Sequence, residues 1–202
     1  MNILIDTLDS ILKSRIGDVE FYTNFRNGIL FEQLMNDPNV KKEDKPLKAI
    51  LLFYANPKEV LKNKESIEKA IDDIIWFYSC GKIEHFSDKE SKKKTKNKTK
   101  NKTSNIYDFN YDDGYIYSAF MQQYGIDLQE IDYLHWWKFK SLFNSLNSDT
   151  KIVEIMGYRS LDLGTIKDKK EKTRLKKLKD IYRLPDMRTE EEKEKDFGSS
   201  LW

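Results

Sequence analysis

The sequence predicts a mainly α-helical protein of about six to seven helices in two segments, with a small β-hairpin near the N-terminus. Apolar residues recur three and four positions apart along most of the chain, which is the spacing of one helix face. Aromatic residues make up 13% of the 202 residues and supply apolar area for a core. This length suits one domain or two small ones.

A lysine-rich tract divides the chain. The predicted parts are an N-terminal helical segment over residues 1–87, a flexible linker over 88–105, a C-terminal aromatic-rich helical segment over 106–185 and a charged tail over 186–202. The linker contains eight lysines against Asp88 and Glu90, which leaves the rest of the chain at −4 within the total of +2. With no apolar residue in its lysine, asparagine and threonine repeat, the tract cannot offset the entropy of ordering by burial.

The N-terminal segment begins with a candidate hairpin. Gly17-Asp18 lies between short, partly alternating runs, which is typical of a turn between two strands. From Asn24 the period becomes helical and ends at Asp37-Pro38. A second helical face stops near Asn56-Pro57 and consists of Leu47, Ile50, Leu51 and Tyr54. A third helix, capped by Ser66 and closed by Gly81, carries the stripe Ile67, Ile71, Ile74, Ile75 and Tyr78.

Four further helices are expected after the linker. Asp112 or Asp113 can cap the first, which ends at Gly125. Asp127 can cap a short turn that leads into a helix over residues 133–146. Ser148 is expected to cap a helix over 149–156, and a lysine-rich helix over about 166–184 has the sparse stripe Leu175, Leu178, Ile181 and Tyr182.

The sequence contains few residues in patterns that are typical of catalytic or metal-binding sites. His85 and His135 have no Cys or His at ligand spacing, and the single Cys80 can form neither an internal disulfide nor a zinc site by itself. The adjacent carboxylates Asp112 and Asp113 are explained by capping. Phosphate-loop, nucleophile-elbow and dinucleotide motifs are missing. We therefore predict no enzymatic activity, no cofactor and no metal site.

An intracellular, soluble protein is expected. The N-terminus lacks a basic stretch followed by an apolar run, so no signal peptide is predicted. No window approaches the roughly 18 apolar residues that a membrane span needs. Nucleic-acid binding through the basic linker is a weaker alternative, because the tract lacks the arginines and interleaved aromatics that read or stack bases.

The aromatic run around the adjacent Trp136 and Trp137 has two interpretations. Their side chains lie about 100° apart on a helix, so both can flank one face. They can form the core of the C-terminal segment, or one of them can lie at an interface, where tryptophan is enriched among binding anchors.

Several motifs resemble those of the bacteriophage gene-product-fifteen family of tailed phages and prophages of Gram-positive bacteria. The resemblance covers nearly all of the chain. It is carried by Thr23-Asn-Phe-Arg-Asn-Gly-Ile-Leu-Phe, Ile75-Trp-Phe-Tyr-Ser-Cys-Gly-Lys, Tyr133-Leu-His-Trp-Trp-Lys-Phe and Met156-Gly-Tyr-Arg-Ser-Leu. The long lysine tract departs from the family's spacing.

That resemblance implies a tail assembly chaperone in the host cytoplasm. Such a protein would bind the tape measure protein and the major tail protein, keep the former soluble during tail morphogenesis, and could self-associate. A minor structural protein of the tail is a further alternative. The candidate protein-binding residues are Trp76, Phe77, Trp136, Trp137, Phe139, Phe143, Tyr158 and Arg159, although a place in the core or at a helix cap is the favoured role of each.

Overall fold

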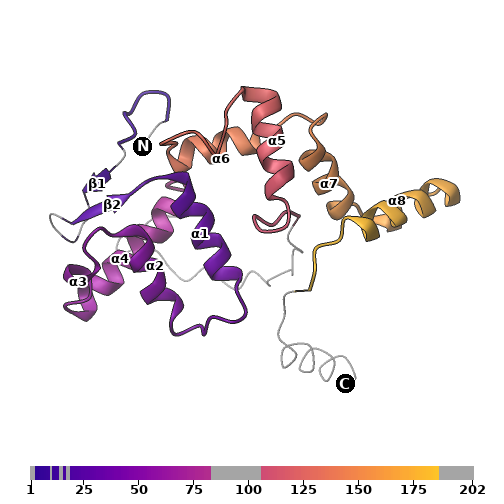
Figure 1. Ribbon diagram of the computed structural model, residues 1–202. Helices are drawn as coiled ribbons and strands as arrows, with labels where there is room; N and C mark the ends of the chain where they lie inside the picture. Colours follow the sequence, from indigo (N-terminus) through magenta and orange to yellow (C-terminus); the bar gives the residue numbers. More distant parts are fainter. Residues whose placement is uncertain (1–2, 10, 14–15, 17–18, 83–105, 187–202) are drawn as a thin grey trace, which may run out of the picture. The chain divides into compact units, whose positions relative to one another are not determined.

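The computed structural model describes residues 3–9, 11–13, 16, 19–82 and 106–186, and it is mainly helical (Figure 1). The predicted linker over 88–105, the turn at Gly17-Asp18 and all but the first residue of the predicted tail therefore lie outside the described residues. Helices α1 to α8 exceed the expected six to seven because 57–60 forms a separate short helix.

The chain divides into two compact units. Unit 1 contains the described residues up to 82 together with Tyr133–Phe139, whereas unit 2 contains residues 106–132 and Lys140–Pro185. This division differs from the one drawn from the sequence, which assigned 133–139 to the C-terminal segment. The reason is that both tryptophans of this stretch pack against helix α4 of the N-terminal segment.

Unit 1 combines a two-stranded pairing with four helices. Strand β1 (Ile11–Lys13) pairs antiparallel with β2 (Glu20–Tyr22), with Leu12 opposite Phe21. The helices are α1 (Phe25–Asn36), α2 (Lys45–Phe53), α3 (Pro57–Val60) and α4 (Lys64–Tyr78). Helix α2 packs against both α1 and α4. Between them lies an aromatic core in which the ring centroid of Phe21 is 5.1 Å from those of Phe53 and Phe77.

Two helix starts in unit 1 can be compared with the sequence, since Asn24 was predicted as the start of a helical period and Ser66 as a cap. The side chain of Asn24 accepts from the N–H of Arg26 at 3.0 Å, and α1 gives way to extended backbone at Asp37, as the sequence predicted. Helix α4 begins earlier than expected, because Asn63 is its cap and accepts from the N–H of Ser66 at 2.9 Å. Ser66 is thus the donor of the capping bond and not the cap.

Unit 2 consists of α5 (Asp113–Tyr124), the end of α6 (Trp136–Asn144), α7 (Lys151–Ser160), a short 3-10 helix η2 (Leu163–Thr165) and α8 (Lys169–Ile181). Helix α7 packs against both α5 and α8. Helix α5 ends at Gly125, whose φ of 64° is left-handed, as predicted. Thr150, and not Ser148, occupies the N-cap position of α7, which continues through Gly157 to Ser160, beyond its predicted end.

Candidate functional site

The aromatic stretch 133–139 joins unit 1 through its backbone. The N–H of Phe25 donates to the carbonyl of Leu134 at 2.8 Å, and the N–H of Trp136 donates to the carbonyl of Thr23 at 2.9 Å. The Thr23 hydroxyl also lies 2.8 Å from the Tyr133 hydroxyl. These bonds hold residues 133–135 in an extended conformation beside the start of α1. Helix α6 therefore begins at Trp136 and not at the predicted residue 133.

Both tryptophans of α6 cap the end of α4. The indole Nε1 of Trp136 donates to the carbonyl of Tyr78 at 2.9 Å, and that of Trp137 donates to the carbonyl of Phe77 at 2.7 Å. The last carbonyls of a helix lack partners within the helix. Because both indoles are almost fully buried, each N–H and each carbonyl finds in the other the partner that burial requires.

A glycine on α1 makes room for Trp136. A Cβ on Gly28 would lie 2.3 Å from Cε3 of that indole, closer than two carbons can approach. The indole also stacks on the ring of Tyr78 at 5.3 Å and on that of Phe139 at 5.7 Å. The Trp136 side chain is thus enclosed by α1, α4 and its own helix, with none of its surface left for a partner.

His135 acts as a neutral acceptor at the start of α6. Its Nδ1 accepts from the N–H of Trp137 at 3.1 Å, and its ring packs edge-on against Phe77 and Trp137. Burial, with a smaller contribution from Lys138, lowers the pKa of His135 from 6.5 to about 4. The imidazole is therefore uncharged near pH 7. Because it accepts from the N–H of Trp137 in the first turn of α6, we interpret it as a helix cap.

Phe143 belongs to a second cluster, in unit 2. Its ring centroid lies 5.0 Å from that of Tyr107 and 6.1 Å from that of Phe109. Lys140 donates to the Tyr107 hydroxyl at 3.1 Å and lies over the Tyr107 ring. Phe143 itself is only 4% exposed, so this cluster fastens the beginning of unit 2 to the last turns of α6.

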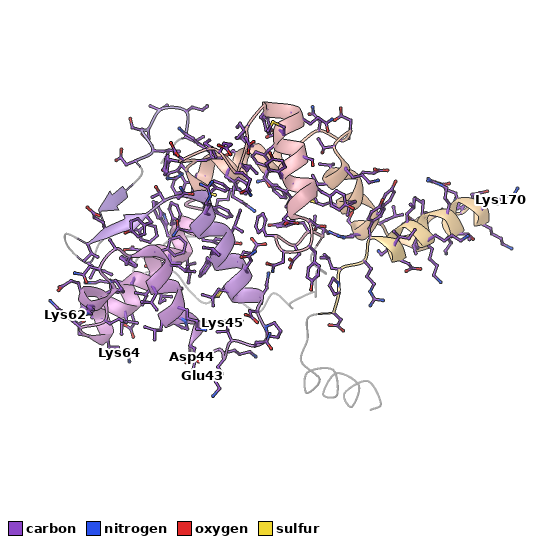
Figure 2. The ribbon with its side chains drawn as sticks, viewed as in Figure 1. Glu43, Asp44, Lys45, Lys62, Lys64 and Lys170 are labelled. Atoms are coloured by element: carbon purple, nitrogen blue, oxygen red, sulfur yellow. The ribbon has the colours of Figure 1, made fainter. Side chains whose placement is uncertain are left out.

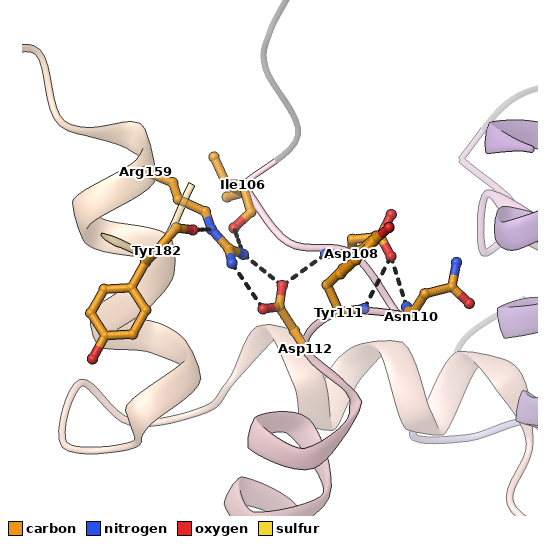
Figure 3. A network of polar contacts seen from close by, with 7 residues as sticks. All are labelled: Ile106, Asp108, Asn110, Tyr111, Asp112, Arg159 and Tyr182. Carbon is orange, nitrogen blue, oxygen red and sulfur yellow. Dashed lines mark hydrogen bonds and ion pairs between the residues drawn. The ribbon is translucent and has the colours of Figure 1, made fainter. Parts of the chain in front are cut away.

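Arg159 is the centre of a polar network (Figure 3). Its guanidinium binds both carboxylate oxygens of Asp112, at 2.6 and 2.9 Å, and donates to the carbonyls of Tyr182 at 2.6 Å and Ile106 at 3.1 Å. Asp112 also accepts from the N–H of Asp108 at 2.9 Å. Asp112 or Asp113 was predicted to cap α5. Asp112 occupies the N-cap position, but its side chain makes no capping bond because Arg159 and Asp108 occupy it.

Tyr158 lies beside this network on α7. Its hydroxyl donates to Glu154, and its ring stacks on Tyr182 with centroids 5.9 Å apart. The hydrogen bond to Glu154 raises the pKa of Tyr158. The pair Tyr158-Arg159 thus holds the end of α8 against α7.

The eight candidate binding residues do not converge on one exposed surface. Trp76 and Tyr158 are half-buried, and the side chain of Arg159 is 9% exposed. Five others are buried aromatic residues and form core contacts in the folded chain, namely Phe77, Trp136, Trp137, Phe139 and Phe143. Of the two interpretations of the tryptophan pair, the structure therefore favours the core, although it is the core of unit 1.

Exposed leucines on α1 and α2 were not recognised as a candidate surface. Leu30 is 47% exposed, Leu47 45% and Leu51 54%. Helical spacing predicts one face for Leu47, Ile50, Leu51 and Tyr54, but only Ile50 and Tyr54 of these four are buried, and the two leucines are exposed. The available signal was the excess of apolar residues in α2, since one helix face cannot bury all of them.

Two classes of site find no support in the part of the chain that the structure describes. No group of three or more His, Cys, Asp or Glu side chains is arranged to hold a metal ion. Among the described helices, none has both the length and the apolar character that a membrane span requires.

Comparison with known proteins gives one match. The model of the family described as Bacteriophage Gp15 protein matches residues 4–184, which is most of the chain and includes both units. No curated protein and no solved structure matches at the threshold applied.

Proposed function

We propose that this chain, which belongs to the bacteriophage Gp15 protein family, is a tail assembly chaperone. It would bind the tape measure protein, the major tail protein or both, and keep the former soluble in the host cytoplasm until the tail tube forms. The family match over residues 4–184 is the observation that carries this proposal. Protein binding, with no bond made or broken, is the activity we infer.

The exposed leucines of unit 1 suit such a client. Helices α1 and α2 pack against each other, and the contact from the Asn27 side chain to the Leu52 carbonyl, at 2.7 Å, holds them together. Leu47 and Leu51 lie one helical turn apart on α2, and Leu30 projects from α1. An amphipathic helix can bury its apolar stripe on a surface of this kind. We therefore assign client binding to these leucines instead of the buried tryptophans.

The experiment is capture of tape measure protein by the tagged full-length chain from cells that express both. Replacing Leu47 and Leu51 together by serine should weaken capture roughly tenfold or more, because two partly exposed anchors are lost. The matched control is Ile181→Ser, which removes an aliphatic side chain that is 70% exposed in unit 2 and should leave capture unchanged. Failure of the wild-type chain to capture any tail component would overturn the function, whereas equal capture by the leucine variant would overturn only the assigned surface.

A further inference from the structure

Charge is unevenly distributed within unit 2. Helix α8 contains seven basic residues against two acidic ones, a net charge of +5, and none of its residues is buried. Residues 106–132 of the same unit contain six acidic residues and no basic one. Exposed ion pairs add little to the stability of a domain, so the fold does not require this segregation. Segregated charge instead suits contact with a complementary surface.

The lysines of α8 form a stripe along the helix. Lys169, Lys172 and Lys176 are spaced three and four residues apart and share one side, over a length of about 10 Å. Within the described residues, no hydrogen bond or ion pair reaches their ammonium groups. By contrast, Arg174 is held by both oxygens of Glu171, and Lys179 donates to the Leu161 carbonyl at 2.6 Å.

Helix α8, which carries this stripe, is attached to unit 2 at its C-terminal end. The C-terminal end of α8 is fastened to α7 by the bond from Arg159 to the Tyr182 carbonyl and by the stacking of Tyr158 on Tyr182. The opposite end, which carries Lys170, projects away from α7 (Figure 2). A well-held arm loses little conformational freedom when it binds, which favours its use as a docking element.

We propose that α8 is a basic arm that docks on the acidic loop 127–132 of a second copy of this chain. The loop contains Asp127, Glu130 and Asp132, and the last two are exposed. Asp127 fixes the loop by accepting from the N–H groups of Gln129, at 2.8 Å, and Glu130. Hydrogen bonding from Gln129 lowers the pKa of Asp127, so this carboxyl is ionised at neutral pH. The arm and the loop are different surfaces of the chain, so the contact between two copies is head to tail. Each bound copy still offers one unused arm or loop, so further copies can be added in succession.

A second copy fits these observations better than nucleic acid does. A polyanion drawn to α8 would also meet the exposed acidic residues of 106–132, which are Asp113, Glu130 and Asp132, and they would repel it. Arg174, the arginine of α8, is engaged with Glu171 and would have to leave that pair to grip a phosphate or a base edge. The acidic loop of another copy needs only the lysine stripe, so Arg174 keeps its pair with Glu171.

Sedimentation velocity of the full-length chain tests this contact. At about 0.01 M salt, where the Debye length is about 30 Å, the wild-type chain should associate as its concentration rises, and at about 1 M salt, where it is about 3 Å, association should be lost. Changing Lys169, Lys172 and Lys176 together to Glu should weaken association roughly tenfold or more. The control changes Lys41, Lys42 and Lys48 of unit 1 to Glu, which shifts the net charge equally and should preserve association.

A charge exchange identifies the loop as the partner. Glu130→Lys with Asp132→Lys should also abolish association, and mixing this variant with the α8 variant should restore it, because each arm then meets a loop of opposite charge. Circular dichroism confirms that each variant is folded. The proposal is overturned if the wild-type chain stays monomeric at low salt, if the control loses association equally, or if the mixture stays monomeric. Binding of duplex DNA by the arm in a chain that does not self-associate would also overturn it.

Discussion

At the scale of single residues, close packing lies where the Trp136 indole crosses Gly28. The glycine has no side chain, and the indole occupies the space that a Cβ would need. Because the indole is fully buried between α1 and α4 and donates to the Tyr78 carbonyl, it cannot move aside without breaking that bond. The sequence alone could not predict that Gly28 is required here, because its partner Trp136 lies more than a hundred residues later in the chain.

Gly28→Ala should destabilise the fold by about 1–3 kcal/mol, the usual cost of overfilling a packed core. The free energy of unfolding in urea measures this effect. The control is Gly157→Ala, where no atom lies within 4 Å of the added Cβ in α7, and this variant should gain about 0.5–1 kcal/mol from helix propensity. An unchanged or higher stability of Gly28→Ala would contradict the packing of Trp136 on α1.

His135 gives the fold a pH dependence of known sign. The pKa of His135 is about 4 in the folded chain and 6.5 when unperturbed. As the pH falls, the unfolded state therefore binds a proton on this residue before the folded state does. The contribution of neutral His135 to the free energy of unfolding is complete above pH 6.5. It is lost as the pH falls towards 4, by about 3 kcal/mol at most. Urea unfolding at pH 7, 5.5 and 4 should show this loss in the wild-type chain and a smaller loss in His135→Asn, whose side chain can still cap α6. Parallel pH profiles would refute the assignment.

At the scale of elements, Arg159 joins parts that are far apart in sequence. It connects the entrance to α5 with the end of α8 through Asp112 and the Tyr182 carbonyl. The side chain of Asp112 is only 1% exposed, so removal of the arginine leaves a buried carboxylate without its cation. Such losses are costly, whereas loss of an exposed pair is not.

Arg159→Met should therefore destabilise the chain by about 3–5 kcal/mol. Arg174→Met is the control, since its partner Glu171 is exposed and the loss should stay below about 1 kcal/mol. Adding Asp112→Asn to Arg159→Met should recover part of the stability, because no buried charge remains. Thermal unfolding of the four proteins gives the comparison, and equal losses for the two arginine variants would show that the network contributes little.

Helix positions were largely predictable from local signals, and helix ends were less so. Asn24, Gly125 and the Asp37-Pro38 stop gave correct boundaries because capping depends on neighbouring residues. The start of α6 was misplaced, since periodicity cannot reveal that the preceding residues pair with Thr23 and Phe25. The ion pair of Asp112 was missed for the same reason, because its partner Arg159 lies on another helix.

At the scale of the whole molecule, the division drawn from the sequence and the two compact units of the structure differ over residues 133–139. The tract of low complexity marked a boundary by composition, which is a local property. By contrast, the grouping of 133–139 with unit 1 depends on contacts between α4 and α6 that have no sequence signature. The same limit affected the candidate binding residues, because large aromatic side chains are preferred both in cores and at interfaces.

Membership in the Gp15 family extends over both units, and the proposed division of labour follows from their surfaces. Unit 1 offers exposed leucines on α1 and α2, which we assign to the client, while unit 2 offers the charged arm and loop, which we assign to other copies. Client binding is then governed by apolar burial and should persist in high salt, whereas contact between copies should not.

The most direct measurement follows light scattering as purified tape measure protein is diluted from denaturant into buffer that contains the purified chain. We predict that scattering falls as the chain is added, at low and at high salt, and that the variant with Leu47 and Leu51 changed to serine suppresses it much less. Scattering that is unaffected by an excess of the folded wild-type chain would contradict the central claim that this protein shelters an aggregation-prone tail component.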